Sequence, residues 1–459
     1  MSQSTARREP PMSPPMSPPM SPPGPVADVG AVESPWLTDA GRAVRDRIRE
    51  LQPLIREQAR EGERIGALTP DVLKALDGAG IYRMTMPIEW GGTALGARDL
   101  VEVVAALGEG DGSAAWSAFV GVGLRHFLAL EPRLVEEIRK DVEGWVGPAM
   151  VGASVFATKV GDARKVDGGW MVRGPWPFGS GSKHARWAMV GVAFDPVVGG
   201  GTGRGVVVLE REQFEILDDW HVMGLSGTAS NSLQVEQEVF VPDYRFLDVG
   251  EFPPRLDELR RRYSGAFRQS MRGFLMTVVL TKTAINLGMA RGALACFAEQ
   301  ARKSKPFTLP YPTVSEMASA QVAAGRALAM IELAGSTIER YADQVDARTK
   351  AGLEFSDAEE SEISLALAYA ANVCEDAINL LQKTLGSSTI SLSNPIQRFV
   401  RDARVVTSHG AIRVDPLAEQ NGRRLLGIAP FPMIGAAVPQ RGVPAPGAVP
   451  PPGNAPAPA

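Results

Sequence analysis

A chain of 459 residues, 44% hydrophobic and 22% charged, is long enough for about two or three packed domains and has an ordinary globular composition. Its net charge of −4 and its non-basic ends argue against nucleic acid or an anionic membrane surface as the main partner. Two cysteines without a Cys/His ligand pattern, no signal-peptide core and no run of about 18 apolar residues predict a cytoplasmic protein with no disulfide framework, no metal site and no membrane span.

Low-complexity segments stand at both ends of the chain. Residues 1–33 contain the repeat MSPPMSPPMSPPGP, and residues 431–459 are rich in Pro, Ala and Gly. Segments of this kind bury too little apolar surface to offset the loss of chain entropy on folding. We therefore expect both to be disordered arms.

Residues 34–149 have a helical pattern. Apolar residues recur at three- and four-residue spacing between Val44 and Ile55. Thr69-Pro70 has the form of a helix cap followed by proline at the first helical position, and we expect that helix to end near Gly78. A further helix is predicted to start around residues 97–99. These residues form a predicted N-terminal helical domain.

The pattern changes near Val151 to short β-rich runs separated by Gly and Asp turns, such as Asp167-Gly168-Gly169. The runs cover 170–172, 188–192, 205–209, 233–235 and 239–241. Residues 150–262 are therefore predicted to form a small β domain with the strand spacing of a barrel or sandwich.

The helical pattern returns in residues 263–430. The Ala-rich stretches 322–333 and 363–385 are apolar over much of their circumference. Helices of this kind bury several faces, as in a four-helix bundle that also packs against other subunits. The fold class is therefore α+β, and we expect a homotetramer, with a monomeric bundle as the alternative.

Three motifs in this order resemble those of the acyl-CoA dehydrogenase superfamily. Residues 86–92 (MPIEWGG) resemble its "P-x-x-x-G-G" loop. Residues 221–230 (HVMGLSGTAS) followed by Val239–Pro242 resemble its "G-x-x-G-T-x-S … F-V-P" signature. Residues 394–403 (NPIQRFVRDA) resemble its "P-x-x-R-x-x-R-D" helix. The resemblance covers roughly residues 38–428 and implies a flavoenzyme with a helix–sheet–helix build.

An acyl-CoA dehydrogenase needs a carboxylate base, which most often lies two residues before the proline of the last motif. That position is Ser393 here, and its neighbours Leu392 and Asn394 cannot ionise either. Because some members carry the base on another helix, an acyl-CoA dehydrogenase or oxidase remains the alternative. A flavin-free scaffold that has kept the fold is a third possibility.

Four further segments resemble the two-component flavin-dependent monooxygenases, the branch that includes secosteroid-phenol hydroxylase and dibenzothiophene monooxygenase components. They are residues 176–187 (WPFGSGSKHARW), 113–116 (SAAW), 401–409 (RDARVVTSH) and 422–427 (GRRLLG). The resemblance implies that reduced flavin, FMNH2 or FADH2, and O2 form a C4a-hydroperoxyflavin that hydroxylates a small aromatic or heteroatom-containing substrate. One departure is that the branch's His-His pair is Ser408-His409 here.

The resemblance also implies roles for single residues. His409 would handle a proton, and Ser180 would donate a hydrogen bond to the flavin. His126 is a candidate for the substrate pocket, whereas His184 and His221 are interpreted as structural and exposed. The implied cofactor contacts are the rings of Trp116 and Phe178, with Trp176 as a further candidate, the glycines Gly179 and Gly181 for close approach of the flavin, and Arg398 and Arg401 for its phosphate. Subunit contacts or ordinary salt bridges are the alternatives for the two arginines.

No "G-x-G-x-x-G" opens a helix after a strand, so the sequence predicts no Rossmann site for NAD(P)H. An oxygenase without such a site must receive reduced flavin from elsewhere. We therefore expect a separate NAD(P)H-dependent flavin reductase as partner. The residues do not identify the substrate.

Overall fold

The structure is a computed structural model that describes residues 34–155, 160–199 and 201–431, without the side chains of residues 123–130 and 199. The arms expected at 1–33 and 431–459 lie outside the described residues, except for residue 431 itself. The described residues from Trp36 onward form one compact unit.

Five helices precede the sheet. Thr69 caps the second of them, because its Oγ1 accepts a hydrogen bond from the N–H of Val72, and Pro70 occupies the first turn, as predicted. The predicted helix start near residue 97 is also confirmed. The helices are α1 (Asp39–Ile65), α2 (Pro70–Gly78), α3 (Ala97–Gly108), α4 (Gly112–Leu130) and α5 (Pro132–Asp141).

The β-rich runs form one mixed sheet with strand order β6-β7-β3-β2-β4-β5-β8, in which β1 also pairs with β4. Residues 167–168 form the turn between β2 and β3, as predicted. The two runs predicted at 233–235 and 239–241 belong to the single strand β7. The strands are β1 (Met150–Ala153), β2 (Gly161–Val166), β3 (Gly169–Trp176), β4 (Trp187–Ala193), β5 (Arg204–Glu210), β6 (Glu215–Ile216), β7 (Leu233–Pro242) and β8 (Phe246–Asp248).

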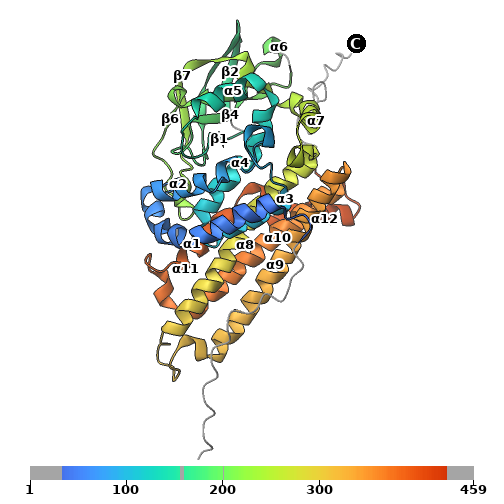
Figure 1. Ribbon diagram of the computed structural model, residues 1–459. Helices are drawn as coiled ribbons and strands as arrows, with labels where there is room; N and C mark the ends of the chain where they lie inside the picture. The colour runs from blue at the N-terminus through green and yellow to red at the C-terminus, as the bar shows by residue number, and fades with distance from the viewer. Residues whose placement is uncertain (1–33, 156–159, 200, 432–459) are drawn as a thin grey trace, which may run out of the picture. The chain divides into compact units, whose positions relative to one another are not determined.

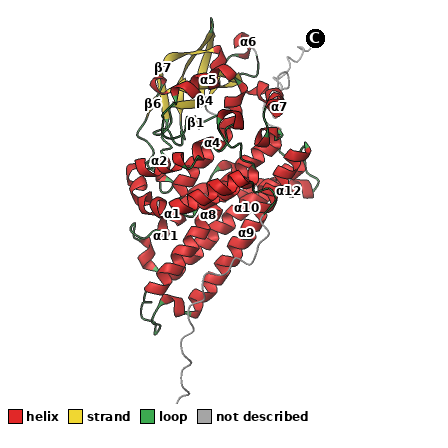
Figure 2. Ribbon diagram, in the orientation of Figure 1, coloured by secondary structure: helices red, strands yellow, loops and turns green. Residues whose placement is uncertain are grey.

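The sheet curls on itself, and Figure 2 shows its strands gathered at one end of the helices. Trp170 of β3 stacks on Phe246 of β8 with ring centroids 4.1 Å apart, although β2, β4 and β5 separate the two strands in the sheet order. The inner face encloses an apolar core, and the outer face packs against Leu134 and Ile138 of α5. Within the described residues, the expected barrel or sandwich is therefore one curled sheet and not two stacked sheets.

Long helices make up the C-terminal part, where α8, α9 and α10 run side by side (Figure 1). Helix α11 packs against α8 and α10, and α12 packs against α10. The helices are α8 (Met271–Lys303), α9 (Ala318–Ala351), α10 (Asp357–Leu385), α11 (Ile396–Thr407) and α12 (Val414–Leu425); α6 (Pro196–Gly199) and α7 (Phe252–Arg262) precede them.

Helix α8 is buried over most of the stretch from Gly273 to Ala293, and exposed residues lie nearer its C-terminal end. By length and composition it could cross a membrane, but 89% of its most apolar window is buried inside the protein. Burial on this scale fits the central helix of a packed core. Helix α9 differs, since its apolar side chains Val322, Leu328 and Leu333 are exposed on the single chain. The single chain therefore does not bury several faces of this Ala-rich stretch, and the predicted burial would need a partner subunit.

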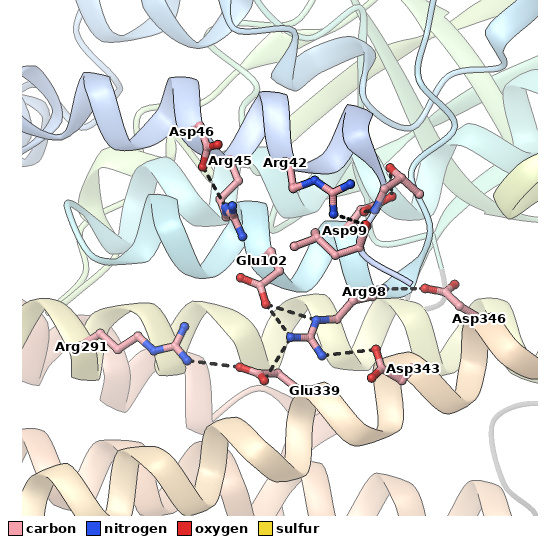
Figure 3. Close-up of polar contacts among 12 residues, drawn as sticks. Arg42, Arg45, Asp46, Arg98, Asp99, Glu102, Arg291, Glu339, Asp343 and Asp346 are labelled. Atoms are coloured by element: carbon pink, nitrogen blue, oxygen red, sulfur yellow. Dashed lines mark hydrogen bonds and ion pairs between the residues drawn. The ribbon is translucent and has the colours of Figure 1, made fainter. Parts of the chain in front are cut away.

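A partly buried polar network joins the N-terminal helices to the C-terminal ones (Figure 3). The guanidinium of Arg98 on α3 pairs with Glu102 at 2.8 Å and with Glu339 and Asp343 of α9 at 3.1 and 3.2 Å. Asp346 of α9 caps the start of α3 by accepting hydrogen bonds from the N–H groups of Ala97 and Arg98 at 2.9 and 2.8 Å. These contacts hold α3, which lies beneath α1, against α9.

Candidate active site

A cavity of about 710 Å³ opens between α4, the β domain and the helices α8 and α11. Its volume falls in the range of small-molecule sites. Aromatic and aliphatic side chains make up most of its wall, with a few hydroxyl groups, one amine and one imidazole. The site is thus largely apolar with a small number of convergent polar groups.

The first polar group is a row of hydroxyls at the wall formed by the β domain. The indole Nε1 of Trp116 on α4 donates to Ser180 Oγ at 3.0 Å. Ser180 Oγ lies 2.7 Å from Ser230 Oγ, which in turn lies 2.7 Å from Thr228 Oγ1. Thr228 completes the row by donating to the carbonyl oxygen of Leu225 at 2.7 Å. Hydroxyls can donate or accept, so this row can adapt to a ligand that needs either.

The second polar group consists of Lys282 and His409. Lys282 Nζ lies 3.0 Å from His409 Nδ1, which also accepts the N–H of Ala411 at 3.2 Å. Burial lowers the pKa of Lys282 to about 7. Desolvation and the neighbouring Lys282 lower the pKa of His409 well below its ordinary value. The imidazole is therefore neutral near pH 7, and the amine is the group that can gain or lose a proton there.

Phe178 marks the mouth of the cavity. Its side chain is 67% exposed, and its φ of +63° lies in the left-handed region, where a bulky residue is strained. Its ring meets that of Trp220 edge to face, with centroids 6.2 Å apart. An exposed aromatic ring held at a strained position in a cavity wall is suited to cover a flat ligand.

Trp176, Gly179 and Gly181, which are neighbours of Phe178, each have a structural role. Trp176 does not wall the cavity, because it is fully buried in the core of the curled sheet and its Nε1 donates to the carbonyl of Gly191 at 2.7 Å. A Cβ at Gly179 would come within 2.8 Å of the carbonyl oxygen of Asn231, and Gly181 has a φ of +82°. Both glycines are therefore needed for the folding of this loop itself.

Arg398 and Arg401 of α11 do not line the cavity. Arg398 is buried beside Asp111, with Nε 3.5 Å from the carboxylate. Arg401 pairs with Glu63 and donates to the carbonyl oxygen of Met223 at 2.5 Å. The two arginines thus hold α11 against α4, α1 and the 221–230 loop, which are the salt-bridge roles considered as alternatives from the sequence.

Asp402, which lies next to Arg401, fixes the same loop. Its Oδ1 accepts the N–H of Leu225 at 2.6 Å, which places the carboxylate beneath the hydroxyl row. Burial, together with the nearby Asp111, raises the pKa of Asp402 to about 7. Burial also raises the pKa of Asp111, while the positive charges of Arg398 and Arg401 offset part of the negative charge of the two carboxyl groups.

His184 and His221 do not line the cavity. The side chain of His126 on α4 lies outside the described residues. His184 Nε2 accepts the N–H of Leu68 at 3.1 Å, and desolvation lowers the pKa of His184 to about 4, as suits a structural residue. His221 is exposed, as interpreted from the sequence.

Sequence reasoning brought together Trp116, Phe178, Ser180 and His409, which all line this cavity. It missed Lys282, Ser230 and Thr228 as site residues. Lys282 had a signal, because it is the only charged residue between Gly273 and Ala290, in an otherwise apolar helix. The hydroxyl pair lay within a quoted motif, but nothing in the pattern shows which of its side chains points to the cavity.

A flavin ring system fits these residues. Aromatic rings flank a space of adequate volume, strained Phe178 is exposed at its edge, and the hydroxyl row offers both donors and acceptors to the polar edge of such a ring. Nothing in the described wall contributes a carboxylate that would repel a flavin anion. Residues 280–414 match the family model described as "Acyl-CoA dehydrogenase, C-terminal domain".

Several known proteins are similar to this chain in sequence and fold. A pigment production hydroxylase from a Rhodococcus species is 30% identical over 82% of this chain and 95% of that protein. The flavin-dependent monooxygenase oxygenase subunit HsaA of Mycobacterium tuberculosis is 30% identical over 79% of this chain and 90% of its own length. The crystal structure of 3-HSA hydroxylase from Rhodococcus sp. RHA1 superposes with a TM-score of 0.74 at 25% identity, over 85% of this chain and 98% of that one. The chain therefore belongs to the acyl-CoA dehydrogenase-like family of flavin-dependent monooxygenase oxygenase subunits, which are oxidoreductases.

Proposed function

We propose that this chain is the oxygenase component of a two-component system that uses reduced flavin, FMNH2 or FADH2, and O2 to hydroxylate a small aromatic or heteroatom-containing substrate. The observation that carries this proposal is a single cavity containing both the hydroxyl row at Ser180 and the amine–imidazole pair at His409. Membership of the oxygenase-subunit family supports it.

Each group in the cavity then has a task. Ser180 donates to the polar edge of the flavin, and Trp116 and Phe178 pack against its ring. The loop glycines Gly179 and Gly181 give the cavity wall its shape. Arg401 serves cofactor binding indirectly through the 221–230 loop, and Arg398 does so through Asp111 at the start of α4. His409 acts in catalysis together with Lys282, whose amine is the group of the pair that exchanges a proton near pH 7. His126, on the same helix as Trp116, is proposed to face the substrate.

The apolar wall has its own task. Bound reduced flavin would supply the activation of O2, and the protein's part is to orient the reactants and exclude water. Trp116, Phe119, Val278 and Val405 exclude water from their part of the cavity. A wetter site would release hydrogen peroxide in place of product.

The alternative, an acyl-CoA dehydrogenase, lacks its base in the described part of this cavity. No Asp or Glu lies in the described wall, and Ser393, at the usual base position, is exposed and bonded to Ser391 Oγ at 2.8 Å. A hydroxyl without a neighbouring base cannot remove a proton alpha to a thioester carbonyl.

We further propose the division of the chain into a helical domain (34–149), a β domain (150–262) and a C-terminal four-helix bundle (263–430). The proposal includes a cytoplasmic homotetramer supplied by a separate NAD(P)H flavin reductase. Support for the assembly comes from the exposed apolar side chains of α9 and of Tyr369 on α10, because contiguous exposed apolar surface commonly marks a protein interface.

The test of the activity needs no reductase. The protein is mixed anaerobically with chemically reduced FMN or FAD and a panel of phenols, indoles and thioethers, and isotopically heavy O2 is then admitted. We expect one product to carry a single heavy oxygen atom, with less hydrogen peroxide than free flavin gives under the same conditions. If no compound gains the label and peroxide equals that of free flavin with either cofactor, the oxygenase proposal fails. Acyl-CoA thioesters with an artificial electron acceptor would then be tested.

A further inference from the structure

Lys282 is a buried amine without a carboxylate partner in the described part of the chain. It lies in the middle of α8 and is 2% exposed. Its Nζ lies 3.0 Å from Nδ1 and 3.5 Å from Nε2 of His409, and 5.2 Å from the centre of the Phe119 ring. Neither neighbour carries a negative charge, although the amine belongs to the wall of the large cavity.

An ammonium group that is removed from water is destabilising unless an anion or several acceptors replace the lost hydration. In the described part of the chain, one imidazole lone pair and one aromatic ring face replace the hydration that the Lys282 amine loses. A leucine or methionine at this position would stabilise the helix packing more. The lysine is therefore better explained by a role that appears when the cavity is filled than by a role in the empty fold.

Lys282 and the hydroxyl row also belong to different parts of the fold. Ser180, Ser230 and Thr228 belong to the β domain and its loop, whereas Lys282 comes from α8 and His409 follows α11. If the hydroxyl row holds the flavin, which rests on the proposed function above, the amine is left to meet the second occupant of the cavity. That occupant is the molecule to be hydroxylated.

We propose that Lys282 is a specificity-determining residue that selects, among small aromatic molecules, those that carry an acidic oxygen. The oxygen of a phenolic hydroxyl or of a carboxyl group binds Nζ as an oxyanion. When a neutral amine meets a phenol, the O–H bond breaks and an N–H bond forms, so the proton passes to Nζ and the net charge of the cavity does not change. An ether of the same shape has no proton to give and leaves the amine without an anionic partner.

The test uses para-nitrophenol, whose anion is yellow and whose neutral form is nearly colourless. The probe is added to the full-length protein, with and without oxidised flavin, at a pH below the pKa of the free phenol. Binding to the wild type is expected to increase the yellow form. Para-nitroanisole, the matched methyl ether, is expected to bind at least about tenfold more weakly, since it forgoes a charged hydrogen bond.

Three variants distinguish the effect of the amine on binding from the effect of general damage to the fold. Lys282→Met should weaken nitrophenol binding by about tenfold to a hundredfold and abolish the colour change, and it should bind the methyl ether no worse than wild type does. Lys282→Arg should restore part of the effect, because the positive charge returns. Lys183→Met, at an exposed lysine of the loop that carries Ser180, is the matched control and should behave as wild type.

The outcomes are distinct. Equal affinity and equal colour in wild type and Lys282→Met would overturn the proposal, as would absence of binding or equal binding of the phenol and its ether. Loss of reduced-flavin affinity with unchanged nitrophenol binding would also overturn it and assign Lys282 to the cofactor. Competition by benzoate would show that a carboxyl group supplies the acidic oxygen as well, whereas its absence would restrict the source to a phenol. Failure of the oxygenase activity itself is seen separately, in the heavy-oxygen experiment.

Discussion

Ser180 is the residue at which three parts of the molecule meet. Its hydroxyl accepts the indole N–H of Trp116 from α4 and contacts Ser230 from the loop before β7. Because it lies between a fixed donor and an adaptable hydroxyl, its own proton is free to turn between Ser230 and a ligand. We expect its loss to disturb the coupling of O2 use to product more than the stability of the fold.

Ser180→Ala is predicted to lower the yield of hydroxylated product per reduced flavin by up to about tenfold, the worth of one hydrogen bond, and to raise hydrogen peroxide in proportion. Product and peroxide are measured in the same single-turnover mixture. Ser182→Ala is the control, because Ser182 lies in the same loop but donates to the backbone carbonyl of Ala229 at 2.8 Å. It should lower stability with unchanged coupling. Equal coupling in all three proteins would contradict a role for Ser180 at the flavin.

At the scale of single residues, sequence motifs predicted several residues that line the cavity, and they failed where the direction of a side chain decides. Ser180 and Trp116 were predicted and meet at 3.0 Å. Trp176 was expected at the flavin, but it ends β3 on the inner face of the sheet, and the strained turn at Phe178 then directs the chain to the cavity. Lys282 was missed because helical periodicity treats a single lysine as an interruption of an apolar face.

At the scale of elements, the start of α3 depends on a side chain from another helix. No residue next to Ala97 caps it; Gly96 has no side chain, and Asp346 of α9 accepts the first N–H groups in its place. Caps of this kind cannot be predicted from local sequence, since the acceptor lies 249 positions away. The cap of α2 by Thr69 could be predicted because all its parts are local.

Burial raises the pKa of Asp346 to about 7, with Asp99 and Asp343 adding to the effect. An acid whose pKa is higher in the folded state contributes stability that is fully present below its ordinary pKa of 3.8 and is lost as the pH rises through about 7. Asp346→Asn cannot ionise and keeps one acceptor oxygen. We therefore predict that the free energy of unfolding of Asp346→Asn, relative to that of the wild type, increases by at most about 4 kcal/mol between about pH 4 and pH 8.

The measurement is urea unfolding of both proteins at several pH values. Other titrating groups are common to the two proteins, so the difference isolates Asp346. If this difference in free energy of unfolding stays constant as the pH rises, or changes in favour of the wild type, the pKa of Asp346 is not raised in the folded protein.

At the scale of the whole molecule, the single chain leaves apolar side chains of α9 exposed to solvent. Its Leu333 is 70% exposed, and Val322 and Leu328 are exposed on the same helix, while α8 beside it is buried. The order of helical, β-rich and helical segments could be predicted from periodicity alone. The choice between a barrel and a sandwich could not, because the pairing of distant strands leaves no local pattern.

Leu333→Glu is predicted to dissociate the assembly into smaller species, since it places a charge in an apolar contact. The molar mass is measured by light scattering over a range of protein concentrations. Val197→Glu, at an even more exposed apolar residue on α6 of the β domain, is the control and should leave the molar mass unchanged. If the wild type is monomeric at every concentration, the homotetramer proposal is wrong.

The attachment of the 221–230 loop to α11 has a consequence for how this protein can change over time. Leu225 and Asp402 are joined by one hydrogen bond but lie 177 positions apart, on either side of the boundary between the β domain and the C-terminal helices. Recombination at that boundary would give a progeny protein half of the attachment from each parent. Because the donor is a main-chain N–H, which every residue except proline carries, we expect a chimera with its crossover at that boundary to keep the attachment whenever the C-terminal parent supplies an aspartate at position 402.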